Sequence, residues 1–253
     1  QTTEFYGILD DIKRDVKTYH INPAMFAEAF TPYAQAGDTV IYLCFSTGIA
    51  GTYNAANIAK DSVLEEYPDF DLTIIDSKCA SAGFGLIVSK LVTMLEKGAS
   101  KEELIEAAGY YISHIHVVFT VQTLAYLIKG GRLTKFKGAI AETLDMKPVL
   151  IVDEEGALSV LKTVRGRKKS LRSLIDYTKE LIQNPETQTI AFTHGEDPES
   201  LDLVKSMAEE EFHPKSFLVS VVGCAIGAHT GRGVIALAFF DADDGKYAGY
   251  FTS

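Results

Sequence analysis

The chain has 253 residues, of which 47% are hydrophobic and 23% charged, and its formal net charge at pH 7 is −10. This length allows one large or two ordinary domains, and the excess of 34 acidic over 24 basic residues argues against wholesale nucleic-acid binding. No apolar run approaches the roughly 20 residues that a membrane helix needs, so no membrane span is expected.

The three cysteines, Cys44, Cys79 and Cys224, are odd in number, far apart and without a Cys-x-x-Cys spacing. This pattern predicts neither a zinc site nor a disulfide framework, and no metal is expected. The first residues also lack the basic and apolar regions of a signal peptide. A reducing cytoplasm is therefore the expected location.

Helices and strands alternate in the first half of the chain. Apolar residues at helical spacing predict an amphipathic helix over residues 3–17, and Asn22-Pro23 predicts the start of a second helix that ends near Ala36. Further strands are predicted at 39–45, 72–76 and 116–121, and further helices at 51–66, 81–97 and 101–113. Strands separated by helices indicate a parallel, Rossmann-like sheet with helices on both faces.

The second half has a different pattern. Residues 148–164 alternate and turn at Asp153–Gly156, which predicts a β-hairpin. Helices at 166–183 and 198–211 and strands at 188–193, 216–222 and 233–240 follow. A hairpin among helices predicts a mixed or antiparallel α/β domain. We place the boundary between an N-terminal domain, 1–116, and a C-terminal domain, 117–253.

The turn after the strand at 39–45 has the composition of an anion-binding loop. Ser46, Thr47, Gly48 and Thr52 provide hydroxyl groups and a flexible backbone directly before a helix, whose first N–H groups favour negative charge. The carboxyl end of the next strand, at Asp76-Ser77, is expected at the same sheet edge. This turn predicts a cradle for a phosphate or a carboxylate.

Three other segments carry polar chemistry with two interpretations each. Thr18-Tyr19-His20 precedes the helix at Pro23 and either meets the Ser46 turn or is a polar connection. Lys129-Gly130-Gly131-Arg132 is either an ordinary helix C-cap or a site where Arg132 forks onto a carboxylate or phosphate. The basic cluster at 165–169 is either a solvated helix start or a docking patch for a phosphate-bearing partner.

A glycine-rich segment, Gly223 to Gly233, is predicted to connect two strands through tight turns. His229 and Thr230 lie in its middle, so His229 is a candidate ligand-binding or catalytic residue rather than a purely structural one. The helix at 81–97 is apolar on nearly every side. It is either ordinary core or one wall of an apolar tunnel.

The order of these motifs resembles the DegV family of bacterial fatty-acid-binding proteins through nearly the whole chain. The segments that carry the resemblance are Ser-Thr-Gly-Ile-Ala-Gly-Thr-Tyr (46–53), Ile-Asp-Ser-Lys (75–78), Thr-Leu-Ala-Tyr-Leu-Ile-Lys-Gly-Gly-Arg-Leu (123–133), Lys-Pro-Val-Leu (147–150), Arg-x-x-Lys-Lys (165–169) and Gly-Ala-His-Thr-Gly-Arg-Gly (227–233). Together these motifs are specific, while each alone is weak.

The resemblance implies a two-domain α/β carrier that is not an enzyme and uses no cofactor. One long-chain fatty acid would be its ligand, with the carboxylate between the domains and the acyl chain in the N-terminal domain, and a separate fatty acid kinase would be its partner. The positions implied for carboxylate binding are Thr18, Tyr19, Ser46, Thr47, Gly48, His229 and Thr230. Those implied for the kinase contact or a phosphate are Arg132 and Arg165.

Some positions depart from the family pattern. Tyr19 replaces a small hydroxyl residue, Thr47 and Ala50 replace serines, and Arg232 replaces proline, which we expect to add a cation beside the carboxylate. The family's first strand, with its Asp-Ser motif, has no counterpart here. Either the sequence is a fragment or the sheet is completed in another way.

Two other classes of function stay open. The chain could be an enzyme that uses His229 as nucleophile or base on a small phosphorylated or carbonyl substrate, although it has no P-loop, metal-ligand cluster or carboxylate pair. It could also be a purely regulatory or interaction module.

Overall fold

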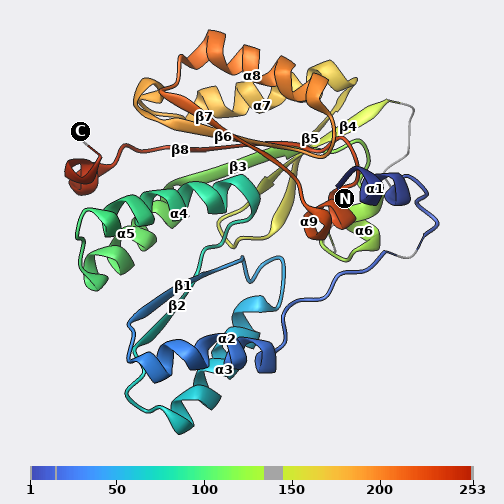
Figure 1. The fold of residues 1–253 in the computed structure, drawn as a ribbon. Coiled ribbons are helices and arrows are strands. Elements are labelled where there is room, and N and C mark those ends of the chain that lie inside the picture. The colour runs from blue at the N-terminus through green and yellow to red at the C-terminus, as the bar shows by residue number, and fades with distance from the viewer. Residues whose placement is uncertain (1, 15, 134–144, 252–253) are drawn as a thin grey trace.

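The computed structural model describes residues 2–14, 16–133 and 145–251, and its elements are stacked in layers (Figure 1). A two-stranded parallel sheet lies between two pairs of helices, and a six-stranded mixed sheet lies beyond the second pair. A third pair of helices covers the far face of the six-stranded sheet. The chain is thus an α/β protein with a small parallel sheet and a larger mixed sheet.

The small sheet pairs β1 (Val40–Cys44) with β2 (Leu72–Asp76) in parallel. Side chains of β1 alternate between its two faces. Val40 and Tyr42 pack on α2 (Pro23–Ala36) and α3 (Thr52–Glu66), whereas Ile41 and Leu43 face α4 (Ser81–Glu96) and α5 (Lys101–His114). Helices therefore cover both faces of this parallel sheet, as the sequence predicted.

Local capping signals set the bounds of α2. The Asn22 side chain accepts a hydrogen bond from the Met25 N–H at 3.0 Å, and Pro23 occupies the first helical position. The helix ends where Gly37 adopts the left-handed conformation, with φ of +72°. The predicted bounds of this helix are confirmed.

The large sheet has the strand order β5-β4-β3-β8-β6-β7. Its strands are β3 (Ile115–Thr120), β4 (Met146–Val152), β5 (Leu158–Arg165), β6 (Thr189–His194), β7 (Ser216–Val221) and β8 (Ile235–Phe240). Neighbours are antiparallel except β6 and β7. One face packs on α4 and α5, and the other packs on α7 (Arg167–Leu181) and α8 (Pro198–Phe212).

The strand predicted at 116–121 is present, but it is not a parallel strand like the others predicted in the first half of the chain. This segment, β3, does not extend the small parallel sheet but pairs antiparallel with β4 and β8 at the centre of the large one. A buried strand has the same apolar pattern in either sheet, so its partners are decided by long-range pairing. The proposed boundary at 116/117 falls inside β3 and remains a prediction.

The remaining elements are short and lie at one end of the large sheet or beside its loops. They are α1 (Thr2–Leu9), α6 (Ala125–Lys129), η1 (Pro185–Thr187), α9 (Cys224–Thr230) and η2 (Gly245–Tyr250). Helix α1 stops well before residue 17, because Tyr6 and Leu9 are buried whereas Ile12 is 42% exposed and has no core to face. The segment from Gly223 to Gly233 contains α9 rather than turns alone.

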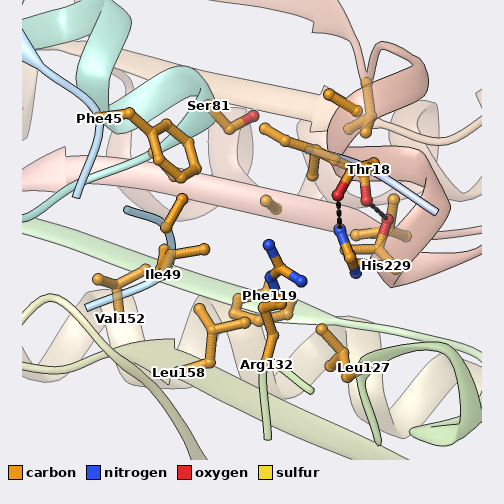
Figure 2. A pocket seen from close by; sticks show the side chains of 18 of the residues that line it. Thr18, Phe45, Ile49, Ser81, Phe119, Leu127, Arg132, Val152, Leu158 and His229 are labelled. Atoms are coloured by element: carbon orange, nitrogen blue, oxygen red, sulfur yellow. Dashed lines mark hydrogen bonds between the residues drawn. The ribbon is translucent and has the colours of Figure 1, made fainter. Parts of the chain in front are cut away.

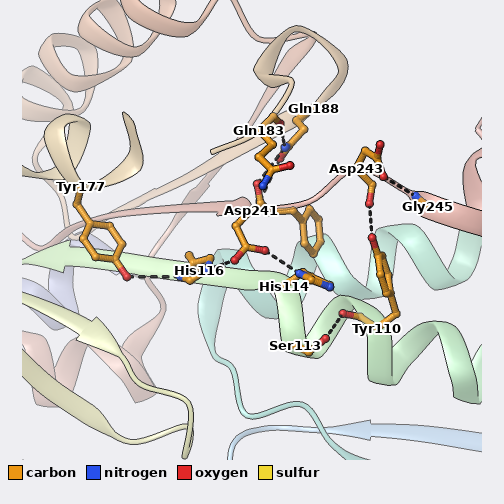
Figure 3. A network of polar contacts seen from close by, with 11 residues as sticks. Tyr110, Ser113, His114, His116, Tyr177, Gln183, Gln188, Asp241, Asp243 and Gly245 are labelled. Carbon is orange, nitrogen blue, oxygen red and sulfur yellow. Dashed lines mark hydrogen bonds and ion pairs between the residues drawn. The ribbon is translucent and has the colours of Figure 1, made fainter. Parts of the chain in front are cut away.

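A polar network joins the start of β3 to the end of β8 (Figure 3). Asp241 accepts hydrogen bonds from His114 Nδ1 and His116 Nε2, both at 2.8 Å. Burial raises the pKa of Asp241, but the hydrogen bonds from His116 and His114 outweigh it and keep the pKa below its usual value.

Within the described ranges, no helix has both the length and the apolar character needed to cross a bilayer.

Candidate functional site

A pocket of about 250 Å³ lies between the small sheet's loops and one face of the large sheet (Figure 2). Its floor comes from β3, β6 and β8, and its roof comes from the turn after β1 and the segment before α2. Most of the lining is apolar and includes Phe45, Ile49, Val117, Phe119, Leu127, Val152, Leu158, Val222, Ile226, Val234 and Ala236. Such a surface suits a hydrocarbon ligand.

Polar side chains gather at one end of this pocket. Thr18 Oγ1 and His229 Nε2 lie 2.6 Å apart and are hydrogen-bonded, although they are 211 residues apart in sequence. The Arg132 guanidinium reaches into the pocket from α6's side and donates through Nη1 to the Gly130 carbonyl at 2.6 Å. Thr230 also lines the pocket, and its hydroxyl donates to the Ile226 carbonyl at 3.2 Å.

The electrostatics of this end favour a neutral imidazole. Burial, and then the nearby Arg132 guanidinium, hold the pKa of His229 below its usual value. The second ring nitrogen, Nδ1, is buried and has no hydrogen-bond partner in the part of the chain that the structure describes. Arg132 therefore provides the positive charge at this end of the pocket, and Thr18 provides a hydroxyl group.

The turn after β1 holds the predicted anion-binding residues in a different arrangement. Ser46 is fully buried, donates to the Gly156 carbonyl at 2.7 Å and accepts from the Gly48 N–H at 3.1 Å. The Thr47 N–H donates to Asp76 Oδ1 at 3.1 Å, so the two carboxyl strand ends meet as predicted. Ser46, Thr47 and Gly48 are not among the residues that line the pocket. Their assignment to a carboxylate remains a prediction.

Three other predicted residues lie at or beyond the rim. Tyr19 contributes to the lining but its side chain is 94% exposed, and Arg165 is exposed at the end of β5, outside the pocket. The expectation for Arg232 was wrong. Its guanidinium bonds to Asp10 and Glu196 and so adds no cation to the pocket, because neighbouring carboxylates satisfy it.

Sequence reasoning missed a hydroxyl pair in the pocket wall. The Ser81 hydroxyl donates to Thr193 Oγ1 at 3.2 Å, and Thr193, which is 2% exposed, follows the apolar residues Ile190–Phe192 in β6. A threonine within such a strand was the only signal, and it is common in ordinary sheets. Thr52 and His20, which lay in segments already noted, line the pocket as well.

An apolar groove of about 500 Å³ lies between β1 and α4. Ile41 and Leu43 line it on β1, and Phe45, the next residue on the same face, lines the pocket. Ser81 at the start of α4 lines the pocket, and Phe84 and Val88, three and seven residues later, line the groove. One strand face and one helix face therefore lead from the pocket to the groove, which supports the tunnel interpretation of α4.

The fold and this site define an α/β protein with an apolar pocket that is polar at one end. Within the described residues, no group of three His, Cys, Asp or Glu side chains could hold a metal ion. A family model described as "Uncharacterised protein, DegV family" matches residues 1–242. The chain belongs to the DegV family.

Known relatives agree with this assignment. The DegV domain-containing protein CPE0026 of Clostridium perfringens is 36% identical over 222 residues, which cover 88% of this chain and 76% of that protein. A DegV family protein from Ruminococcus gnavus, solved with vaccenic acid, is 26% identical with a TM-score of 0.86, over 94% of this chain and 84% of that one.

A third similar protein shares the fold. The Fatty Acid Kinase (Fak) B3 protein of Streptococcus pneumoniae, solved with linoleic acid, has a TM-score of 0.84 over 96% of this chain and 84% of that one. Its sequence is 22% identical. At this identity the similarity establishes the fold alone.

Proposed function

We propose that this chain is a carrier that binds one long-chain fatty acid and presents its carboxylate to a separate fatty acid kinase. The observation that carries the proposal is a pocket whose lining is mostly apolar and which is polar where Thr18 meets His229. Burying the acyl chain contributes roughly 0.8 kcal/mol per methylene group, so a long chain provides ample affinity without any chemistry.

The carboxylate is proposed to lie at the polar end. A buried charge needs hydrogen-bond donors or a countercharge; Thr18 provides a hydroxyl group and Arg132 a positive charge there, with Thr230 beside them. The acyl chain would then run past Phe45 toward the groove between β1 and α4. Ser46, Thr47 and Gly48 are proposed as an outer part of the carboxylate site, and Tyr19 as a residue of its mouth.

We propose the kinase partner from the family resemblance and from the positions of two arginines. Arg132 at the polar end and the exposed Arg165 at the end of β5 are proposed to face the phosphate or the kinase, because arginine binds such groups bidentately. The kinase would transfer the terminal phosphoryl group of ATP to a carboxylate oxygen, which leaves ADP and an acyl phosphate. A partner that consumes ATP is consistent with a cytoplasmic location, and so are the three free cysteines.

The enzyme alternative finds less support. A catalytic histidine is normally oriented by a third group on its second nitrogen. His229 Nδ1 instead faces Gly130 and has no partner among the described residues. A histidine that holds a hydroxyl in place suits binding better than proton transfer.

Mass spectrometry tests the proposal directly. An organic extract of the purified protein is analysed beside the intact protein under native conditions, and one fatty acid per chain is expected. An empty protein that also fails to take up added oleic acid would contradict the carrier function. Acyl phosphate should form only when a bacterial fatty acid kinase and ATP are added, and turnover by the chain alone would favour the enzyme.

A further inference from the structure

The two adjacent glycines after α6 have different conformations. Gly131 has φ of +72°, in the left-handed region that favours glycine. Its neighbours complete a helix C-cap, in which the Arg132 N–H donates to the Leu127 carbonyl at 2.9 Å. Gly130 has φ of −77° and ψ of −5°, which any residue adopts. Helix termination therefore explains Gly131 but not Gly130.

A close contact explains the glycine at position 130. A Cβ atom there would lie 2.0 Å from His229 Nδ1 and 2.8 Å from His229 Cε1. Carbon and nitrogen atoms cannot approach so closely without a bond, so the imidazole occupies the place of the missing side chain. This contact also accounts for the burial of Nδ1.

The Gly130 carbonyl also binds the Arg132 guanidinium, which is the positively charged group of the site. Gly130 O accepts the hydrogen bond from Arg132 Nη1, and Arg132 helps to lower the pKa of His229. We propose that Gly130 is the positioning residue of this site, which sets the imidazole of His229 and the guanidinium of Arg132 relative to each other. The expected effect on ligand affinity rests on the proposed function, whereas the positions of the two side chains do not depend on it.

Further contacts hold α6 closely against its neighbours. A Cβ atom at Gly231, directly after α9, would lie 2.6 Å from Cδ2 of Tyr126 on α6. The Tyr126 hydroxyl donates to the Leu9 carbonyl at 2.8 Å, which ties α6 to the end of α1. We therefore expect a side chain at position 130 to displace the His229 ring rather than the helix.

The test is the Gly130→Ala variant, studied first without ligand. Titration of the His229 ring by NMR should give a pKa below about 6.5 in the parent protein and a higher one in the variant, because the ring leaves its buried seat. Gly109→Ala is the matched control, since a Cβ atom at Gly109 in α5 would meet no other atom within 4 Å and should leave the His229 titration unchanged. An unchanged titration in Gly130→Ala would overturn the proposal.

A double-mutant cycle with His229→Ala measures the coupling. We expect Gly130→Ala to weaken oleic acid binding at least tenfold in the parent background and less than twofold in the His229→Ala background. Equal losses in both would overturn the positioning role. If Gly130→Ala alone does not fold, the double variant with His229→Ala decides the matter. A folded double variant supports a clash between the new methyl group and the imidazole, and an unfolded one contradicts it. Failure of the parent protein to bind any fatty acid would refute the proposed function, but the ligand-free titration would still test the positioning role of Gly130.

Discussion

Replacing Thr18 by valine tests the polar end of the pocket most directly. The two side chains have nearly the same shape, so the change removes the hydroxyl group and little else. The lost hydrogen bond to His229 Nε2 is 2.6 Å long and partly buried. Leaving that nitrogen unpaired should lower the free energy of unfolding by about 1–3 kcal/mol, the usual cost of an unsatisfied buried group.

Ligand affinity should fall as well. If the Thr18 hydroxyl donates to the fatty acid carboxylate, its removal forfeits a hydrogen bond to a charged group, which is worth about 1.5–3 kcal/mol. This loss corresponds to a rise in Kd of roughly 10- to 100-fold. Displacement of a fluorescent fatty acid measures Kd, and urea denaturation of the ligand-free protein measures stability separately.

Two controls separate binding from folding. Thr18→Ser keeps the hydroxyl and should keep Kd within about threefold of the parent value, well under the tenfold that 1.4 kcal/mol produces. Thr31→Val makes the same chemical change inside α2, where the hydroxyl donates to the Ala27 carbonyl, and should not alter Kd. A Thr18→Val protein that loses stability but binds fatty acid as tightly as the parent would refute the placement of the carboxylate.

Three further outcomes are expected. Tyr6→Phe should lower the unfolding free energy by about 1–3 kcal/mol in urea denaturation, because the buried Tyr6 hydroxyl donates to a carbonyl at 3.0 Å; an unchanged midpoint would contradict this. Asp241→Asn should destabilise the protein at pH 7, since His114 and His116 lose their shared carboxylate. The pKa of Asp241 is lowered by folding, so its stabilisation is present above pH ~3.9 and is lost as the pH falls further; the variant's acid-denaturation curve should lack this component. Ala236→Leu fills the pocket floor and should weaken binding of stearic acid more than of decanoic acid, whereas equal effects would argue against an acyl chain on that floor.

Local signals in the sequence were sufficient for most element bounds. The Asn22-Pro23 start and the Gly37 end of α2 depend on hydrogen bonds within a few residues, so short segments encode them. The hairpin of β4 and β5 likewise follows from alternation and a glycine turn. Helix α1 was predicted too long because periodicity continues past Leu9, while the surface that could bury Ile12 does not.

The membership of β3 and the partners of the polar residues depended on the tertiary structure. Ser46 is paired with a carbonyl 110 residues away, and Arg232 is neutralised by Asp10, which is 222 residues away. No spacing rule reports such contacts, because they result from how whole layers pack. The hydroxyl pair of Ser81 and Thr193 became visible for the same reason.

The family, the α/β class and the residue types from which a carboxylate site can be built were all predictable from the amino-acid sequence. Short sequence motifs are enough to predict these properties, because each motif encodes a turn, a helix cap or a reactive side chain through residues that are close together in the chain. Which of these residues meet depends on the folded chain: Thr18 and His229 lie at one end of an apolar pocket, with Gly130 against the imidazole. Caps and turns are stabilised by contacts within a few residues, whereas a binding pocket forms only when distant layers pack together and exclude water.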